Sequence, residues 1–185
     1  MSRMSSPHPF TFPDFRAYWL SRFASMLATY GMMLIIGWQA YNLAREDMGI
    51  GASAGILGLL GLLQFVPLFV LTPLSGWVAD RWDRRWVVRL FITMQTAIAA
   101  LLAWLTWSDQ ISLWWIYAVS IMLGICRAFI GPALGALAPN LVPREALPRA
   151  IALSTIAWQI GVIAGPGFAG PLYDIADWMP YTVCA

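Results

Sequence analysis

Two long stretches without a charged residue constrain the fold of this chain more than any other feature. Met48–Ala79 and Leu90–Ser108 contain no Asp, Glu, Lys or Arg. An α-helix of about 20 mostly apolar residues crosses a bilayer, so each stretch is long enough to hold a membrane-spanning helix. The segment Ser75–Arg89, where the two stretches meet, is the densest charge cluster in the sequence. A short charged segment at this place is typical of a tight turn that returns the chain into the membrane.

The composition excludes an ordinary soluble domain. The 185 residues are 60% hydrophobic and only 11% charged, with a mean hydropathy of +0.69. Charged residues make up about 25% of a typical globular chain. The 11 tryptophans fit a membrane protein, because Trp concentrates at membrane interfaces. Cys126 and Cys184 lie in apolar runs without the spacing of a metal site or a disulfide, so we expect no metal and no cofactor.

The apolar runs and the polar segments between them predict an all-α polytopic membrane protein. Five spans are expected at about residues 18–44, 54–79, 87–107, 112–138 and 147–173, with the start of a sixth from residue 178. Residues 1–15 are predicted to form a cytoplasmic tail, and residues 16–185 a partial N-terminal transmembrane bundle. Pro67 and Pro73 should bend the second span, because each removes one helical hydrogen bond. Since the sequence ends within the sixth element, we expect a fragment, whether natural or truncated.

The arginines predict the orientation of the bundle. The chain has 11 Arg and no Lys, and nine of the 11 fall on one side of the predicted bundle. These nine are Arg3, Arg16, Arg22, Arg81, Arg84, Arg85, Arg89, Arg144 and Arg149. Arg45 falls on the other side, and Arg127 lies within the fourth span. Because cytoplasmic loops are enriched in Arg and Lys, the sequence predicts a cytoplasmic N-terminus.

The charged turn carries a recognisable motif. It has the pattern G-x-x-x-D-R-x-x-R-R, formed by Gly76, Asp80, Arg81, Arg84 and Arg85. A carboxylate near a helix C-terminus opposes the helix dipole, so Asp80 needs a cation or the N-terminus of a facing helix. Gly76, one helical turn earlier, would let such a helix approach. The motif resembles the loop between spans two and three of the major facilitator superfamily, with Asp83 where the family has glycine. An ordinary positive-inside loop is the alternative interpretation.

Arg127 is the only charged residue in the fourth predicted span. Burying a guanidinium near mid-bilayer costs at least about 2.5–3.5 kcal/mol on insertion scales, so we expect Arg127 to face a cavity or a partner. The alternative is that the span begins later and the side chain reaches the interface. With Gly131, Arg127 resembles the fourth-span R-x-x-x-G element of the superfamily. In related antiporters that element is associated with proton coupling.

The fifth predicted span contains Gly161, Gly165, Pro166 and Gly170; Gly161 and Gly165 share one helix face, and Gly170 nearly joins them. Small residues at this spacing allow close helix packing, and Pro166 removes the helical partner of the Val162 carbonyl. We expect a pliable helix that packs closely against a neighbour. The segment resembles the G-x-x-x-G-P motif of exporters in the superfamily, although a generic kinked helix is the simpler alternative.

Together the three motifs resemble the N-terminal half of a major facilitator transporter, in the branch of enterobactin exporters and macrolide efflux proteins. The resemblance implies export of a small organic compound, of drug, macrolide or siderophore type, by alternating access and in exchange for protons. It implies that the Asp80 motif latches one conformation, that Arg127 lines the cavity, and that Gly165-Pro166 supplies flexibility. Further expected partners are the bilayer and the remaining transporter half, in the plasma (bacterial inner) membrane. No Asp or Glu lies inside a predicted span, so a proton-carrying carboxylate is missing from this sequence.

Three other functions stay open at the sequence level. A solute importer of the same superfamily would share the Asp80 turn. A structural or accessory membrane protein would need no transport site. Gly51–Gly55 also fits the G-x-S-x-G pattern of hydrolases around Ser53, but that chemistry needs a strand-turn-helix setting and a histidine base. The only histidine, His8, lies in the predicted tail, so we expect no enzyme.

Overall fold

The computed structural model describes residues 8–47 and 49–185, and these residues form a bundle of long α-helices without strands. The helices are α1 (Pro13–Asp47), α2 (Ile50–Arg81), α3 (Arg84–Trp107), α4 (Leu113–Leu137), α5 (Leu147–Ile175) and the short α6 (Met179–Cys184). Within the described residues, α1 to α5 are long and apolar enough to cross a membrane. The predicted all-α polytopic membrane fold is therefore confirmed.

The first two helices begin earlier than the charge pattern suggested. Residues 1–7 of the predicted tail lie outside the described residues, but a 3₁₀ turn (Pro9–Thr11) and the start of α1 occupy the rest. The Phe10 ring packs against Phe15 and Trp19, with centroids 5.7 and 5.6 Å away, and this aromatic contact holds the segment on α1. α2 is already helical from Ile50, ahead of the predicted start at residue 54.

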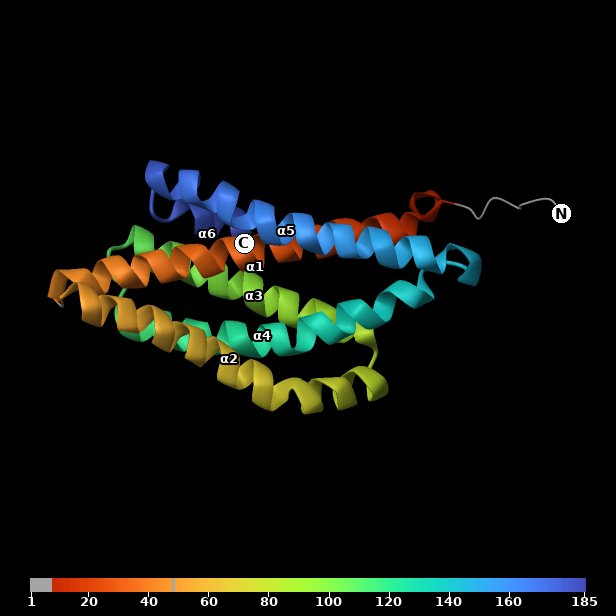
Figure 1. Cartoon of the computed structure of the whole chain (residues 1–185), viewed down its shortest axis with the longest axis horizontal. Helices are drawn as coiled ribbons and strands as arrows, with labels where there is room; N and C mark the ends of the chain where they lie inside the picture. The colour runs from red at the N-terminus through yellow and green to blue at the C-terminus, as the bar shows by residue number, and fades with distance from the viewer. Residues whose placement is uncertain (1–7, 48) are drawn as a thin grey trace.

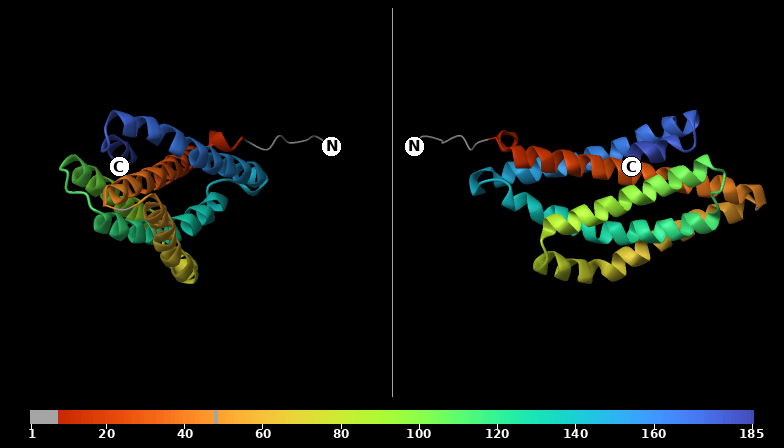
Figure 2. Two further views of the ribbon diagram at one scale, coloured as in Figure 1. Left: turned by 60° about the vertical axis from the view of Figure 1, so that its left-hand side comes forward. Right: turned by 180° about the vertical axis from the view of Figure 1, so that it is seen from behind.

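The helices pair in an order that differs from their order in the sequence. α1 packs mainly against α5, and α4 packs against both α2 and α3. By contrast α2 and α3, which follow each other directly, make few contacts. Figure 1 shows the second half of α2, past Pro67 and Pro73, turning away from the bundle, and Figure 2 shows the same divergence from the other sides. The prolines explain the bend, because each leaves a carbonyl of the preceding turn without its helical donor.

One end of the bundle carries most of the positive charge. The start of α1, the α2–α3 turn and the α4–α5 connection all lie at this end, on the right of Figure 1. We call it the basic end, after Arg81, Arg84, Arg85, Arg89 and Arg144. Arg45, near the end of α1, lies at the opposite end.

Buried polar pairs join α1 to α3 and α6. Gln39 Nε2 donates to Thr106 Oγ1 over 3.1 Å, and the Tyr181 hydroxyl donates to Gln39 Oε1 over 2.8 Å. A second pair joins the same two long helices where Gln95 Nε2 donates to Thr29 Oγ1 over 2.8 Å. Helices in lipid gain little from hydrophobic contact with each other, so such polar pairs and close packing hold them together.

Tyr181→Phe is expected to lower the free energy of unfolding by about 1–2 kcal/mol, because it removes one interhelical hydrogen bond and leaves the buried Gln39 Oε1 without a donor. Tyr181 is fully buried, so water cannot replace the lost bond. SDS titration of the detergent-purified protein, followed by circular dichroism, measures the change. Tyr117→Phe is the control, because in the described part of the chain no hydrogen bond is recorded for its hydroxyl. Equal stability of the two variants would contradict the role of the Tyr181–Gln39 bond.

Candidate functional site

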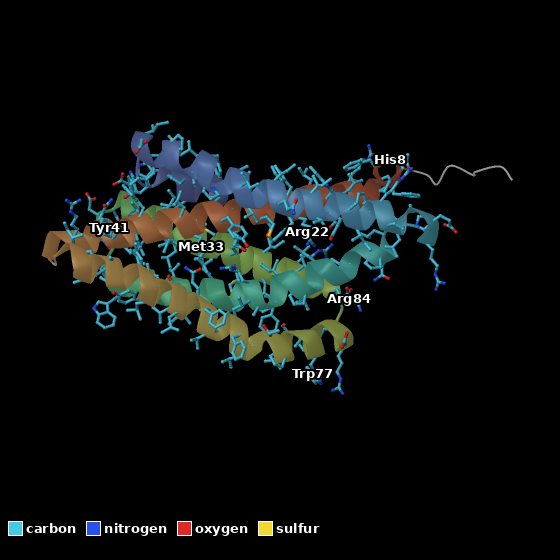
Figure 3. All side chains as sticks on the ribbon, viewed as in Figure 1. His8, Arg22, Met33, Tyr41, Trp77 and Arg84 are labelled. Carbon is cyan, nitrogen blue, oxygen red and sulfur yellow. The ribbon has the colours of Figure 1, made fainter. Side chains whose placement is uncertain are left out.

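One face of α1 carries a row of large side chains beside an open hollow. The row recurs at helical spacing and contains Tyr30, Met33, Trp38, Tyr41 and Arg45. The hollow has a volume of about 780 Å³ and is also lined by Leu57 of α2 and Pro166 of α5. Trp38 is 55% exposed and Met33 40% exposed, so both present much of their surface to the open side. Figure 3 labels Met33 and Tyr41 along α1. We call this space the aromatic hollow; its size is typical of a ligand site.

A smaller cavity of about 170 Å³ lies beside the aromatic hollow and shares one wall with it. Its lining includes Thr29, Tyr30, Gln95, Arg127, Gly131 and Trp158. Tyr30 lines both spaces. A Cβ on Gly131 would meet nothing within 4 Å, so the glycine keeps this wall open. We call this second space the arginine recess.

The half-buried Arg127 is held by neutral groups from two other helices. Its Nη1 donates to Gln64 Oε1 of α2 over 3.4 Å and faces Met33 Sδ of α1 at 3.9 Å. Its guanidinium carbon lies 5.7 Å from the centre of the Tyr30 ring. These contacts are long, and none of them within the described residues is to a carboxylate. The positive charge of the guanidinium is therefore not neutralised by these contacts, and several of its five N–H donors are available to a further group.

Two of the three motif glycines in α5 lie against α1. A Cβ on Gly165 would lie 2.6 Å from the Leu27 carbonyl oxygen and 2.9 Å from the Gly31 nitrogen. A Cβ on Gly161 would lie 2.7 Å from Met26 Cβ. The backbones are thus too close for any side chain at these positions. By contrast, a Cβ on Gly170 would meet nothing within 4 Å.

The charged turn is organised by the residue at which it departs from the family pattern. Asp83 Oδ1 accepts a hydrogen bond from the Arg85 backbone N–H over 2.9 Å and so caps the N-terminus of α3. Its φ of −61° is ordinary for a non-glycine residue, which is why aspartate fits where the family has glycine. The sequence contained this signal, since Asp is a preferred N-cap, but the cap was not predicted.

The other residues of the charged turn lie at the surface of the bundle. The Arg81 guanidinium carbon lies 4.5 Å from the centre of the Trp77 ring, and Figure 3 shows Trp77 and Arg84 at the basic end. Asp80 is exposed, and no hydrogen bond or ion pair is recorded for it within the described residues. A Cβ on Gly76 would meet nothing within 4 Å. Neither Gly76 nor Asp80 is therefore packed against any of the described helices.

A polar cluster around Tyr18, at the basic end, was not predicted from the sequence. The Tyr18 hydroxyl donates to the Leu134 carbonyl over 3.1 Å and accepts from Arg22 Nη1 over 3.0 Å. Ser154 Oγ lies 2.9 Å from the same hydroxyl, whose single proton already goes to Leu134, so Ser154 must donate. This cluster joins α1, α4 and α5. The cluster brings together residues more than a hundred positions apart, so no local sequence pattern could have predicted it.

Ser53 lies within the first turn of α2, not on a turn between a strand and a helix. Its side chain is fully buried, and its hydroxyl donates to the Gly49 carbonyl over 3.2 Å. His8 lies beyond the other end of the bundle, where its Nδ1 accepts from the Phe10 backbone N–H over 3.4 Å. This arrangement offers Ser53 no histidine base.

The sequence is similar to those of known membrane transport proteins. Over 123 residues the chain is 31% identical to macrolide efflux protein A of Streptococcus pyogenes, covering 66% of this chain and 30% of that protein. The same identity and chain coverage hold for macrolide efflux protein A of Enterococcus faecalis, of which 38% is covered. The chain thus spans well under half the length of these relatives. Residues 18–185 match the Major Facilitator Superfamily. This chain, an integral membrane protein by its five apolar helices and its sequence match, belongs to the Major Facilitator Superfamily.

Proposed function

We propose that the chain is part of a secondary active transporter that exports small organic compounds by alternating access. The observation that carries the proposal is the aromatic hollow on α1, which lies beside the arginine recess and shares its Tyr30 wall. Apolar and aromatic walls with a few convergent polar groups are typical of small-molecule sites. The relatives named as macrolide efflux proteins support export as the direction. The family and this geometry support a transporter in place of an enzyme.

The orientation follows from the charge distribution. Among the described residues, the arginines at the start of α1, in the α2–α3 turn and around the α4–α5 connection lie at or near the basic end, and Arg45 lies at the opposite end. This asymmetry supports an orientation in which the basic end is cytoplasmic, with the N-terminus inside, in the bacterial inner membrane. Asp80 would act as a latch at this end. Its carboxylate is exposed on the diverging part of α2, where a helix from the remaining half of the transporter can reach it.

Proton antiport is part of the proposal, although this chain supplies only half of a coupling site. No Asp or Glu lies inside a helix away from its ends. Arg127 would lower the pKa of a carboxylate brought from another part of the protein, since a nearby cation favours the charged form. Gly161 and Gly165 would let α5 move against α1 without changing partners, and Pro166 would let it bend beside the aromatic hollow.

The direction of transport is tested in cells that lack their own efflux pumps and express the complete reading frame containing this chain. We expect these cells to accumulate a fluorescent apolar compound several-fold less than cells with an empty vector. Everted membrane vesicles should take the compound up when a proton gradient is imposed, and an ionophore should stop the uptake. Higher accumulation in the cells would favour an importer instead. Equal accumulation over a panel of compounds would favour an accessory membrane protein.

A further inference from the structure

The aromatic hollow and the arginine recess are each lined by one arginine. Arg127 lies in the recess and Arg45 lines the hollow. Among the side chains that the structure describes, none that lines either space belongs to an Asp or Glu. Arg127 is half-buried, and a cation partly removed from water is stabilised by an opposite charge or by several hydrogen bonds; among the described residues it has only long contacts to neutral groups. The face is therefore built to receive an anion and to repel a cation.

The recess also presents a hydrogen-bond acceptor without a donor. Thr29 Oγ1 donates its only proton to the Ser25 carbonyl over 2.7 Å, so it must accept from the Gln95 amide at 2.8 Å. This fixes the orientation of the amide, with Nε2 toward Thr29. Gln95 is 6% exposed, and its Oε1 has no hydrogen-bond partner among the described residues. An unpaired buried carbonyl has lost its hydrogen bonds to water, so a ligand that donates to it gains affinity.

We propose that the site takes an apolar organic acid, whose acidic head enters the arginine recess and whose body lies in the aromatic hollow. This rests on the proposed function and names its substrate class. The recess, at about 170 Å³, has room for a carboxylate and a few waters, while the hollow, at about 780 Å³, fits the apolar body. Tyr30 lies where head and body join. A hydroxyl in the head would donate to Gln95 Oε1 while the carboxylate accepts from Arg127. A protonated amine would meet Arg127 with no carboxylate beside it.

The test compares three probes with one body and different heads: pyrenebutanoic acid, its methyl ester and pyrenebutylamine. The protein, expressed from its complete reading frame, is placed in nanodiscs of neutral lipid at pH 7.4. Energy transfer from tryptophan to pyrene then reports binding, with empty nanodiscs as the background. We expect the acid to bind at least tenfold more tightly than the ester and the amine. Arg127→Gln should weaken binding of the acid about tenfold and leave the ester unchanged, as expected for a charge-assisted hydrogen bond.

Arg149→Gln is the matched control. Arg149 is exposed near the start of α5, so this substitution removes the same charge outside the site. It should leave all three affinities unchanged. Equal affinity for acid and ester, tighter binding of the amine, or an acid affinity that Arg127→Gln does not change would each overturn the proposal. The last result is also what a carboxylate from elsewhere in the protein, already paired with Arg127, would produce.

Gln95→Leu tests the acceptor separately. The α-hydroxy derivative of the acid should bind a few-fold more tightly than the acid itself to the wild-type protein, and equally to Gln95→Leu. No hydroxyl preference in the wild-type protein would remove Gln95 from the site. Transport measurements separate this inference from the proposed function: export that ignores the charge of the head would overturn the substrate class alone. Arg127-dependent binding of the acid without export of any probe would overturn the transport function alone.

Discussion

Gly165→Ala is expected to lower the free energy of unfolding by about 1–3 kcal/mol, the usual penalty for overpacking a tight interface. The added methyl group would lie 2.6 Å from the Leu27 carbonyl oxygen and 2.9 Å from the Gly31 nitrogen. Both are backbone atoms of α1, so no side chain can rotate out of the way, and the two helices must separate. α1 and α5 form the most extensive helix pair of the bundle, and a separation here would loosen it throughout. Unfolding in SDS, followed by circular dichroism, measures the loss.

Gly170→Ala provides the matched control on the same helix. The added methyl group meets nothing within 4 Å, so the substitution changes only the intrinsic helix propensity, which favours alanine. Its unfolding free energy should equal or exceed that of the wild-type protein. Gly161→Ala, which would bring a methyl group 2.7 Å from Met26 Cβ, should also destabilise the protein, because Met26 Cβ moves only with the α1 backbone. If Gly165→Ala and Gly170→Ala were equally stable, the close approach at Gly165 would not be what holds α5 to α1.

The sequence predicted five long apolar helices because polar segments that carry charged residues, which are costly in lipid, separate them. It could not predict how the helices pair. These helices are apolar nearly all round, so no single face can be identified from the sequence as the one that packs against another helix. The glycine spacing in α5 indicated a close-packing face, but nothing in it pointed to Gly31 on α1 as the opposite residue. The weak contact between α2 and α3 was equally hidden, because a tight turn normally implies that its helices pack together.

For the site, too, the sequence indicated some residues, while others could be found only from the fold. A lone arginine in an apolar span indicates a cavity on energetic grounds, whatever the rest of the protein looks like. Its partners Gln64 and Met33 come from helices 63 and 94 positions away in the sequence and could not be inferred. The lining aromatics were also beyond reach, because tryptophans that face lipid and those that face a ligand have the same local sequence. Only the placement of Trp38 beside the aromatic hollow separates it from Trp114, which is 80% exposed and lines neither space.

Arg127→Ala is expected to reduce efflux at least tenfold while leaving membrane insertion unchanged. Among the described residues that line the arginine recess, Arg127 is the only cation, so the substitution removes both the proposed partner of a ligand anion and the group proposed to tune a coupling carboxylate. Insertion should not suffer, because removing a guanidinium from mid-span lowers the insertion cost by about 2.5–3.5 kcal/mol. Efflux is measured as the loss of a preloaded fluorescent compound from cells, and insertion as the amount of protein in washed membranes.

Arg144→Ala is the control for this measurement, because Arg144 is exposed in the connection between α4 and α5, outside both cavities. It removes the same charge and should retain wild-type efflux. Arg127→Lys distinguishes charge from shape: a lysine keeps the cation but cannot reproduce the planar, five-donor geometry of the guanidinium, so we expect partial efflux. Undiminished efflux in Arg127→Ala, at equal amounts of inserted protein, would exclude Arg127 from transport. The aromatic hollow would then have to bind its ligand through apolar contacts alone, and the charge of the ligand would no longer matter to the site.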